Sequence, residues 1–530
     1  MNLENTRLLL IGSNYRQDTN IEDPGPGLLF ERFSPFDMPT DEVVEAKRIV
    51  LTDPDVRRRI AKLSLPADAQ TQCDTWPYSA DKLSIPEIPR LIQAMLYGPE
   101  SDKYSFPIPM SPVIDMDQQR IVRVDELPSR DIGAYYANET PAEALSASPM
   151  AHCIGNENHP SIQYGNLRKD LKPLSIIQPE GTSFKVQGET VISWQKWQFR
   201  LAFNWREGTT IHNVRYDNRE LFYRLSLSEM TVPYGGSIQY FNFKRKDSRG
   251  GSRKAANVVC LREQVRPLYS FTLSPAVYIN SMITVGNYEY VFSWLFSQSG
   301  GTVEFETRAT GILATSLIDA GQISYWDNVV SPGVLEANHQ HLFCLRVDPM
   351  IDGSENTVVQ QDSVLLPLSE TENPLSNTWQ VVQQPIEKSL YVDAAAERAR
   401  VIKIVNEKCQ NPTSGKPVGF KLVQQLDLLF PSSLFANLHP WSRDAPVSPS
   451  TTSGWPNGVV DYSARNEDVR DQDLVLWHTH RITYNPSVED YPVMPCEIVT
   501  IALKPADFFL IRIRLSMCPR GSGPSVIACF

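Results

Sequence analysis

Several features that define other classes of protein are missing from this chain of 530 residues. Its eight cysteines are scattered and form no Cys-x-x-Cys pair, which excludes a zinc ribbon and argues against a disulfide-built scaffold. The formal net charge is −11, from 50 Lys and Arg against 61 Asp and Glu. This balance argues against nucleic acid or an anionic membrane as the main partner.

Membrane and targeting segments are also missing. No apolar run approaches the roughly 18 residues that a membrane-spanning helix needs. The apolar run at residues 8–11 is too short for a secretory signal, and Cys529-Phe530 gives neither a peroxisomal nor a prenylation address. The compartment therefore stays open, although the cytoplasm or the peroxisome is favoured over secretion.

What the chain does contain is typical of a folded, strand-rich protein. Hydrophobic residues make up 42% and charged residues 21% of the sequence, which excludes wholesale disorder. Apolar and polar residues alternate with period two around residues 197–204, 288–296 and 339–347, as they do in half-buried strands. The pattern predicts a mainly β fold, with a large antiparallel β-sandwich that follows a small α+β domain.

The same patterns suggest domain limits. Residues 1–38 have no clean period and are interpreted as a remnant or disordered segment, 39–135 as the small α+β domain, 136–180 as a connector, and 181–530 as the sandwich. One helix is predicted to follow Thr40 and to end before Pro54. A second is predicted at about residues 89–97, before Gly98-Pro99.

Three segments carry residues that could do chemistry. His339-Gln340-His341 places two imidazoles on one face of a strand, about 6.6 Å apart at Cα, where they could share a metal. Residues 284–290 combine a threonine, an asparagine and two tyrosines, and His478, His480 and Tyr484 share a strand face. Taken singly, each segment is more simply explained by ordinary half-buried sheet residues.

Taken together, the three segments resemble the copper amine oxidases. Residues 284–290 are similar to the quinone signature T-x-x-N-Y-(D/E)-Y of that family, and the histidine pair follows about fifty residues later. Residues 489–495 resemble the segment after the family's third copper ligand. Further matches lie at residues 178–181, 194–197, 223–230 and 232–235.

The resemblance implies a specific activity. The family oxidises primary amines with O₂ to aldehyde, ammonia and H₂O₂, using copper and a topaquinone made from its own tyrosine, here Tyr288. Carried over, His339, His341 and Tyr484 would be the copper ligands, Tyr234 would hydrogen-bond the quinone, and Asn287 would hold its surroundings. A homodimer is the expected assembly, with no nucleic acid or membrane partner.

Two departures from the family argue against an active enzyme. Tyr484 stands where the family has a histidine, and a phenol must lose its proton to become a strong ligand. His480 cannot replace it, because four residues on a strand span about 13 Å. The segment that supplies the catalytic base after Gly235 is missing, and Asp247 lies in a charged cluster. The alternative is therefore an impaired or inactive homologue, or a mis-assembled gene model, with weak copper binding and slow turnover.

Two smaller expectations follow from the resemblance. A peripheral calcium would draw on Asp348, Asp352 and Asp473, but Met350 replaces a usual carboxylate, so these residues are interpreted mainly as surface acids. Cys260 matches one partner of a family disulfide whose other cysteine is missing here. It is therefore predicted to be a free thiol.

Overall fold

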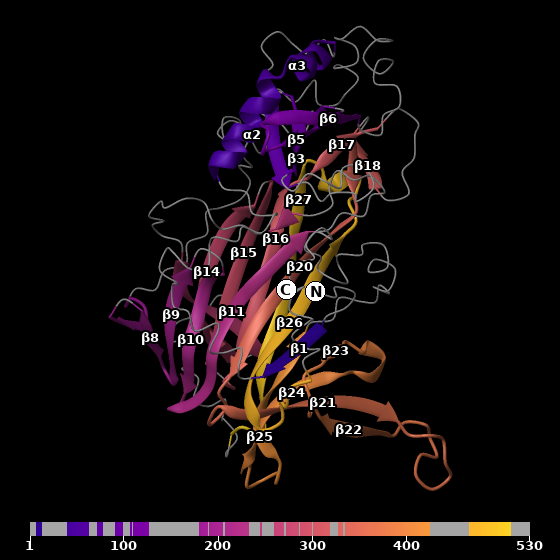
Figure 1. Cartoon of the computed structure of the whole chain (residues 1–530). Helices are drawn as coiled ribbons and strands as arrows, with labels where there is room; N and C mark the ends of the chain where they lie inside the picture. The colour runs from indigo at the N-terminus through magenta and orange to yellow at the C-terminus, as the bar shows by residue number, and fades with distance from the viewer. Residues whose placement is uncertain are drawn as a thin grey trace, which may run out of the picture.

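The computed structural model describes residues 7–12, 40–62, 71–77, 91–98, 107–126 without 109, 180–424 with short gaps, and 466–509. The gaps are 189, 205–206, 233–243, 246–258, 270–271, 286, 299, 319–326 and 332–333. A small N-terminal domain stands at one end of a large sandwich of antiparallel strands (Figure 1). The predicted fold class is confirmed.

The small domain packs two helices on an antiparallel sheet. Helix α2 (Thr40–Thr52) ends before Pro54 as predicted, and α3 (Pro54–Ala61) begins at that proline. The Asp53 carboxylate caps α3 by accepting from the backbone N–H of Asp55 and Val56 at 2.8 and 3.0 Å. The sheet runs in the order β2-β3-β5-β6, with β4 paired to β3. Its strands are β2 (Gln72–Pro77), β3 (Leu91–Tyr97), β4 (Pro107–Ile108), β5 (Met110–Asp115) and β6 (Arg120–Glu126).

The prediction of a second helix at residues 89–97 is wrong, because this segment contains strand β3. Every residue of Leu91–Tyr97 is buried, including Gln93. A surface helix of this length would turn one polar face to water, whereas a central strand is covered on both faces. Uniform burial of the segment, including Gln93, is therefore the mark of a central strand, and Gly98 follows its last residue.

The sandwich consists of two layers of antiparallel strands, packed face to face. The first layer contains, in spatial order, β7 (Lys185–Gln187), β8 (Val191–Trp194), β9 (Trp197–Asn204), β10 (Gly208–Tyr216), β11 (Arg219–Val232), β20 (His339–Pro349), β26 (Gln472–Tyr484), β1 (Arg7–Gly12) and β23 (Tyr391–Asp393). Strand β12 (Lys244–Arg245) pairs with the end of β11.

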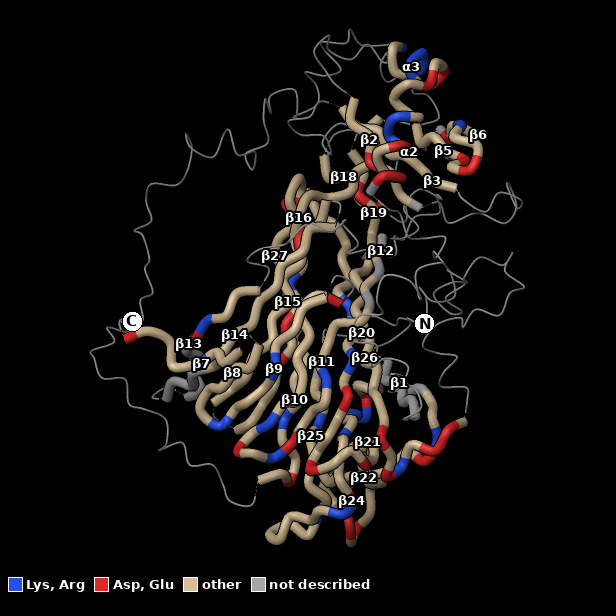
Figure 2. Tube along the Cα trace, turned by 60° about the vertical axis from the view of Figure 1, so that its left-hand side comes forward, with Lys and Arg blue, Asp and Glu red and all other residues tan. Residues whose placement is uncertain are grey.

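The second layer is built in the same way. It contains β13 (Val259–Tyr269), β14 (Thr272–Val285), β15 (Tyr288–Ser297), β16 (Val303–Ile312), β27 (Val493–Ala506), β25 (Pro417–Gln424), β24 (Val401–Gln410), β21 (Glu355–Leu365) and β22 (Trp379–Pro385). Strands β21 and β22 form a hairpin that projects from the sandwich at lower right in Figure 1. Charged residues mark the turns at that end (Figure 2).

Alternating side chains fill the space between the layers. From β15, Tyr288, Tyr290, Phe292 and Trp294 are all buried. The ring of Phe292 meets that of Phe343 on β20, with centroids 6.0 Å apart. The strands predicted from alternation near residues 197–204, 288–296 and 339–347 are confirmed as β9, β15 and β20.

A third, short sheet closes the sandwich next to the small domain. It contains β17 (Thr315–Leu317), β19 (Val334–Ala337) and β18 (Asp327–Ser331). At this end Ile312 packs against Met95 and Tyr97 of strand β3. Two single-turn helices complete the described elements, η4 (Ala396–Arg398) and η5 (Val488–Asp490). Strand β15 begins, and β26 ends, at this end of the sandwich.

Candidate active site

Tyr288 is the first residue of β15 and is fully buried between the layers. Its cross-strand partner on β16 is Gly311, whose φ is +131°. A Cβ at Gly311 would lie 2.6 Å from the Tyr288 Cα and 2.4 Å from the Asn287 carbonyl oxygen. Only glycine therefore allows the two backbones to approach this closely and adopts this φ without strain.

The residues around Tyr288 are fixed by local hydrogen bonds. The buried Asn287 side chain donates to the Ile312 carbonyl, and the Ile312 N–H donates back to the Asn287 carbonyl at 2.8 Å. Thr284 donates to the Glu289 carboxylate at 2.9 Å across the β14–β15 pair. The threonine, asparagine and glutamate of this motif thus hold the turn that presents Tyr288.

Two histidines of β20 face Tyr288 from the opposite layer. His339 and His341 are buried, with ring centroids 4.8 Å apart, and their centroids lie 5.5 and 5.0 Å from that of Tyr288. The Nδ1 of His339 lies 2.9 Å from the Ala337 carbonyl oxygen, which can only accept. Nδ1 is therefore the protonated nitrogen, and the lone pair of Nε2 faces the Tyr288 hydroxyl at 3.2 Å.

Tyr484 completes the cluster from the neighbouring strand of the same layer. It is the cross-strand partner of His339, and the two ring centroids lie 5.3 Å apart. Burial, together with the nearby carboxylate of Asp490, raises the pKa of the Tyr484 phenol above its ordinary value. The phenol therefore stays neutral at ordinary pH unless a cation draws off its proton.

His480 lies elsewhere, as the strand spacing required. It pairs with Phe343, stacks on that ring at a centroid distance of 5.2 Å, and approaches Thr307 at 3.2 Å. Burial lowers the pKa of His480 well below its ordinary value, so the ring is neutral. His478 lies two residues before His480 on β26, further from Tyr484, and its ring stacks on that of His480 with centroids 6.1 Å apart. Neither ring reaches the Tyr288 cluster.

The chain that carries this cluster matches known proteins along most of its length. The model of the copper amine oxidase enzyme domain matches residues 185–245 and 235–520, and that of the copper amine oxidase N3 domain matches residues 41–138. The chain belongs to the copper amine oxidase family. The family uses copper and topaquinone, so the resemblance inferred from the motifs is confirmed.

Curated relatives of this family match along most of the chain. Copper amine oxidase 1 of Aspergillus niger is 37% identical over 521 residues, which cover 86% of this chain and 77% of that protein. The peroxisomal primary amine oxidase of Pichia angusta is 28% identical over 548 residues, 88% and 77% of the two chains. Among solved structures, the copper-containing benzylamine oxidase from Hansenula polymorpha has a TM-score of 0.76 at 29% identity, covering 93% of this chain and 86% of that one.

The residues around Tyr288 fit the copper of the family in part. The Nδ1 of His339 faces the Ala337 carbonyl oxygen, which leaves Nε2 as the nitrogen that this ring can offer to a metal. The Nδ1 of His341 lies 2.9 Å from the Tyr290 hydroxyl, which can donate or accept. Imidazole nitrogens suit copper. The described residues contain no group of three or more His, Cys, Asp or Glu side chains placed for a metal, so a third strong ligand is not supplied by these types. Tyr484 is the side chain in the third position.

Two residues near the site were not singled out from the sequence. Tyr290 belongs to the quinone motif but was assigned to the core, and its hydroxyl lies 2.9 Å from Nδ1 of His341. Glu336 is fully buried on β19, with a carboxylate oxygen 3.7 Å from Nδ1 of His339. The available signal for Glu336 was an acidic residue within the apolar segment Val334–Ala337.

Tyr234 and Asp247, and the connection after Gly235 in which a catalytic base was sought, lie outside the described residues. The structure therefore leaves the role of Tyr234 as a prediction. The absence of the segment that supplies the base likewise stays a prediction. The copper amine oxidase model matches in two pieces that overlap at residues 235–245, where that segment was sought.

The residues predicted for calcium, Asp348, Asp352 and Asp473, belong to no group of three or more metal-ligating side chains among the described residues. Asp348 is fully buried, not a surface acid, and its carboxylate pairs with Arg346 at 3.1 Å. Both oxygens of Asp352 are engaged by the Arg219 guanidinium. Because a hard cation needs six or more oxygens, carboxylates already paired with arginine do not fit a calcium site.

The described cysteines, Cys73, Cys260, Cys344, Cys409 and Cys496, form no disulfide, and Cys260 is a free thiol. The prediction for Cys260 is thereby confirmed. Cys260 is exposed on β13, where it pairs with Asn280 of β14, so a partner cysteine would have to come from another segment.

Proposed function

We propose that this chain oxidises primary amines with O₂ at the site around Tyr288, giving aldehyde, ammonia and H₂O₂. The observation that carries the proposal is the buried Tyr288 hydroxyl, 3.2 Å from Nε2 of His339 and beneath the ring of His341. Relatives that match along most of the chain carry amine oxidase names.

Each residue has a separate task in this proposal. His339 and His341, with Tyr484, would hold copper. When bound, copper with O₂ supplies the oxidation of Tyr288 to topaquinone, which serves as the electron sink for amine oxidation. Asn287 and Gly311 keep the Tyr288 backbone in place, and burial of the ring excludes water from the reacting atoms. Tyr234 is proposed to hydrogen-bond the quinone oxygen.

Tyr484 is the residue that limits this activity. A neutral phenol is a poor copper ligand, so the metal must displace a proton that burial and Asp490 hold in place. The shortened connection after Gly235 further removes the segment that supplies the base, and general-base catalysis typically contributes 10²–10⁴-fold. We therefore expect weak copper binding and slow turnover in the chain as it stands.

The test compares matched variants after copper loading in air. Tyr288→Phe removes the quinone precursor, Tyr484→His restores an imidazole, and Tyr216→Phe changes a buried tyrosine elsewhere in the core. A quinone-cycling stain and H₂O₂ release from benzylamine or a short alkylamine are measured with and without a hydrazine. We expect a small, Tyr288-dependent and hydrazine-sensitive signal that Tyr484→His increases and Tyr216→Phe leaves unchanged.

Two results would decide against the proposal. If neither the parent chain nor Tyr484→His gives a Tyr288-dependent stain, the chain is an inactive homologue, the alternative that the Tyr484 substitution favours. If the parent chain turns over briskly, Tyr484 does not limit activity, and another carboxylate has replaced the missing base.

A homodimer is proposed as the assembly, formed through the projecting hairpin of β21 and β22 (Figure 1). A hairpin that contacts only water would carry mainly polar side chains. This hairpin and its loop instead expose the apolar side chains of Leu365, Leu368, Leu375, Trp379, Val381 and Val382. A second copy of this chain is the partner because the family assembles as homodimers. Light scattering should give a dimer mass for the parent, and Trp379→Ser with Leu375→Ser should give monomers. A dimer mass for the double variant would show that the hairpin of β21 and β22 is not the dimer interface.

The proposed location is the cytoplasm or the peroxisome. A curated relative carries the name peroxisomal, and the described residues contain no helix that is long and apolar enough to span a membrane. Fluorescent fusions made separately at the N-terminus and at the C-terminus, imaged beside a peroxisomal marker, test this. Secretion of either fusion would contradict it.

A further inference from the structure

Tyr290 lies two residues after Tyr288 on β15, so both side chains point toward β20. The Tyr290 hydroxyl oxygen lies 2.9 Å from Nδ1 of His341, and both residues are fully buried. We propose that Tyr290 is a positioning residue for His341, which holds the imidazole so that Nε2 faces Tyr288. The inference rests on the proposed copper site and assigns to it a side chain beyond the three ligands.

The direction of this hydrogen bond decides whether Nε2 of His341 has a lone pair available for a metal. If Nδ1–H donates to the tyrosine oxygen, the lone pair lies on Nε2, and the ring can ligate copper near Tyr288. If the phenol donates to Nδ1, Nε2 carries the hydrogen and cannot ligate. His339 is already held in the first form, because its Nδ1 faces the carbonyl oxygen of Ala337. The proposal assigns the same form to His341, with Tyr290 as acceptor.

Packing fixes the position of the Tyr290 oxygen. Its ring is parallel to that of Phe292, with an interplanar angle of 1° and centroids 6.2 Å apart, and meets Phe343 edge-on at 6.0 Å. These contacts lie on both layers, so the phenol cannot turn without displacing a buried ring. An acceptor with a fixed position selects one orientation of the imidazole, as groups behind metal-ligating histidines generally do.

The position of Tyr290 also connects two parts of the site. Tyr288 and Tyr290 are paired through their backbones with Gly311 and Ala309 of β16. The strand that presents the quinone precursor therefore also orients one metal ligand of the opposite layer. A shift of β15 would move both groups together, which keeps their relative position.

The inference is tested with copper binding, independently of turnover. Cu(II) is titrated into the metal-free chain under anaerobic conditions, and the Kd and the EPR hyperfine splitting are recorded for the parent, Tyr290→Phe and Tyr216→Phe. Loss of a group behind a ligating histidine typically weakens metal binding on the order of 10–100-fold. We expect that loss and an altered EPR spectrum for Tyr290→Phe. Tyr216→Phe should match the parent, because its hydroxyl has only a long contact, 3.5 Å, with the Gln298 carbonyl.

His341→Ala separates failure of this inference from failure of the proposed site. If His341→Ala binds copper as the parent does, the proposed copper site is wrong. If His341→Ala weakens binding while Tyr290→Phe leaves the Kd and the spectrum unchanged, the site stands and the role of Tyr290 is wrong. Tighter binding by Tyr290→Phe would also overturn it, because the phenol would then be the donor that holds His341 in the wrong form.

A second comparison covers the case in which Tyr290→Phe does not fold. Tyr290→His offers an acceptor nitrogen on a shorter side chain, whereas Tyr290→Leu offers none. We expect tighter copper binding by Tyr290→His than by Tyr290→Leu, and equal Kd values would overturn the inference. Combining Tyr290→Phe with His341→Ala should add no further loss, since Tyr290 acts through His341.

Discussion

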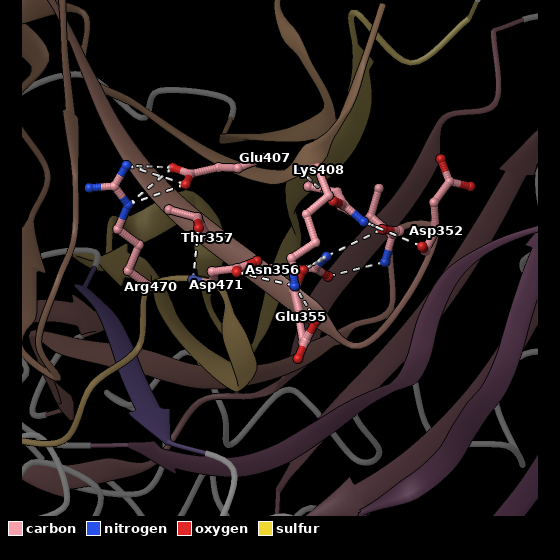
Figure 3. Close-up of polar contacts among 10 residues, drawn as sticks. Asp352, Glu355, Asn356, Thr357, Glu407, Lys408, Arg470 and Asp471 are labelled. Carbon is pink, nitrogen blue, oxygen red and sulfur yellow. Dashed lines mark hydrogen bonds and ion pairs between the residues drawn. The ribbon is translucent and has the colours of Figure 1, made fainter.

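Strands β20 and β26 connect two polar regions of opposite character. At one end of the pair lie His339 and Tyr484, and at the other, roughly 35 Å away for an 11-residue strand, lies the turn that follows Pro349. The first end is built from neutral, buried rings and contains the candidate copper site. The second is a network of ion pairs and amide contacts that lies mostly at the surface (Figure 3).

At the second end, a buried asparagine side chain lies within the charged network. Asn356 is fully buried, and its side chain bonds both the N–H and the carbonyl of Ile351, at 3.1 and 3.2 Å. Around it, Lys408 pairs with Glu355 and Asp471, and Arg470 pairs with Glu387 and Glu407. The two cations, Glu355 and Glu387 are exposed, whereas Asp471 and Glu407 are partly buried. The comparison teaches that burial, rather than the number of polar contacts, decides how much each contact contributes to the free energy of unfolding.

The largest effect is expected at Gly311. An alanine there would force its Cβ against the backbone of Asn287 and Tyr288 and would adopt a positive φ, at a cost of about 3–5 kcal/mol in the free energy of unfolding. Gly353 is the matched control at the other end, because its φ is +134° but the nearest atom to an added Cβ lies 3.9 Å away. Urea denaturation should show a clearly smaller loss for Gly353→Ala, about 1–2 kcal/mol. Equal losses would mean that backbone strain alone sets the cost.

Asn356→Ala should have the next largest effect on stability. It leaves the buried Ile351 N–H without its present partner, whereas the Ile351 carbonyl keeps the bond donated by Asn406 at 2.9 Å, so the cost is about 1–3 kcal/mol. Thermal unfolding of the variant, beside that of Asn377→Ala at an exposed turn, measures this cost. A change in the melting temperature no greater than that of the control would show that water replaces the lost amide.

Tyr484→His should strengthen copper binding by about tenfold or more, because an imidazole ligates without the loss of a tightly held proton. His480→Phe is the control, since His480 stacks on Phe343 away from the cluster. Isothermal titration with Cu(II) gives both Kd values. No gain for Tyr484→His would remove Tyr484 from the ligand set.

Lys408→Ala should have the smallest effect. The ammonium is exposed, and the acids it meets, Glu355 and Asp471, are also partly solvated, so salt and water already screen the pairs. We expect no measurable change in the melting temperature at 0.15 M salt. A clear drop would show that the network acts as a unit, which removes the contrast with the buried end.

Much of the candidate site could be predicted because its residues lie in short linear motifs. Alternation with period two places His339 and His341 on one face, whatever their partner strand is. Contacts between distant strands could not be predicted in this way. The register of Tyr484 against His339 depends on strand pairing within one layer, and the hydrogen bond between Tyr290 and His341 depends on how the two layers pack. The strand at Leu91–Tyr97 was mistaken for a helix because its length and apolar content fit both elements.

The positions of the strands also bear on how this gene can change. Tyr288 is held by pairing of β15 with β14 and β16, and the histidines by pairing of β20 with β11 and β26. None of these pairings uses residues 233–258, which lie between β11 and β13. An inherited insertion or deletion there alters a connection and leaves the distance between Tyr288 and His339 intact. Length changes in this connection can therefore remove the groups predicted to lie there, Tyr234 and the catalytic base, without changing the strand pairing that places Tyr288 opposite the histidines.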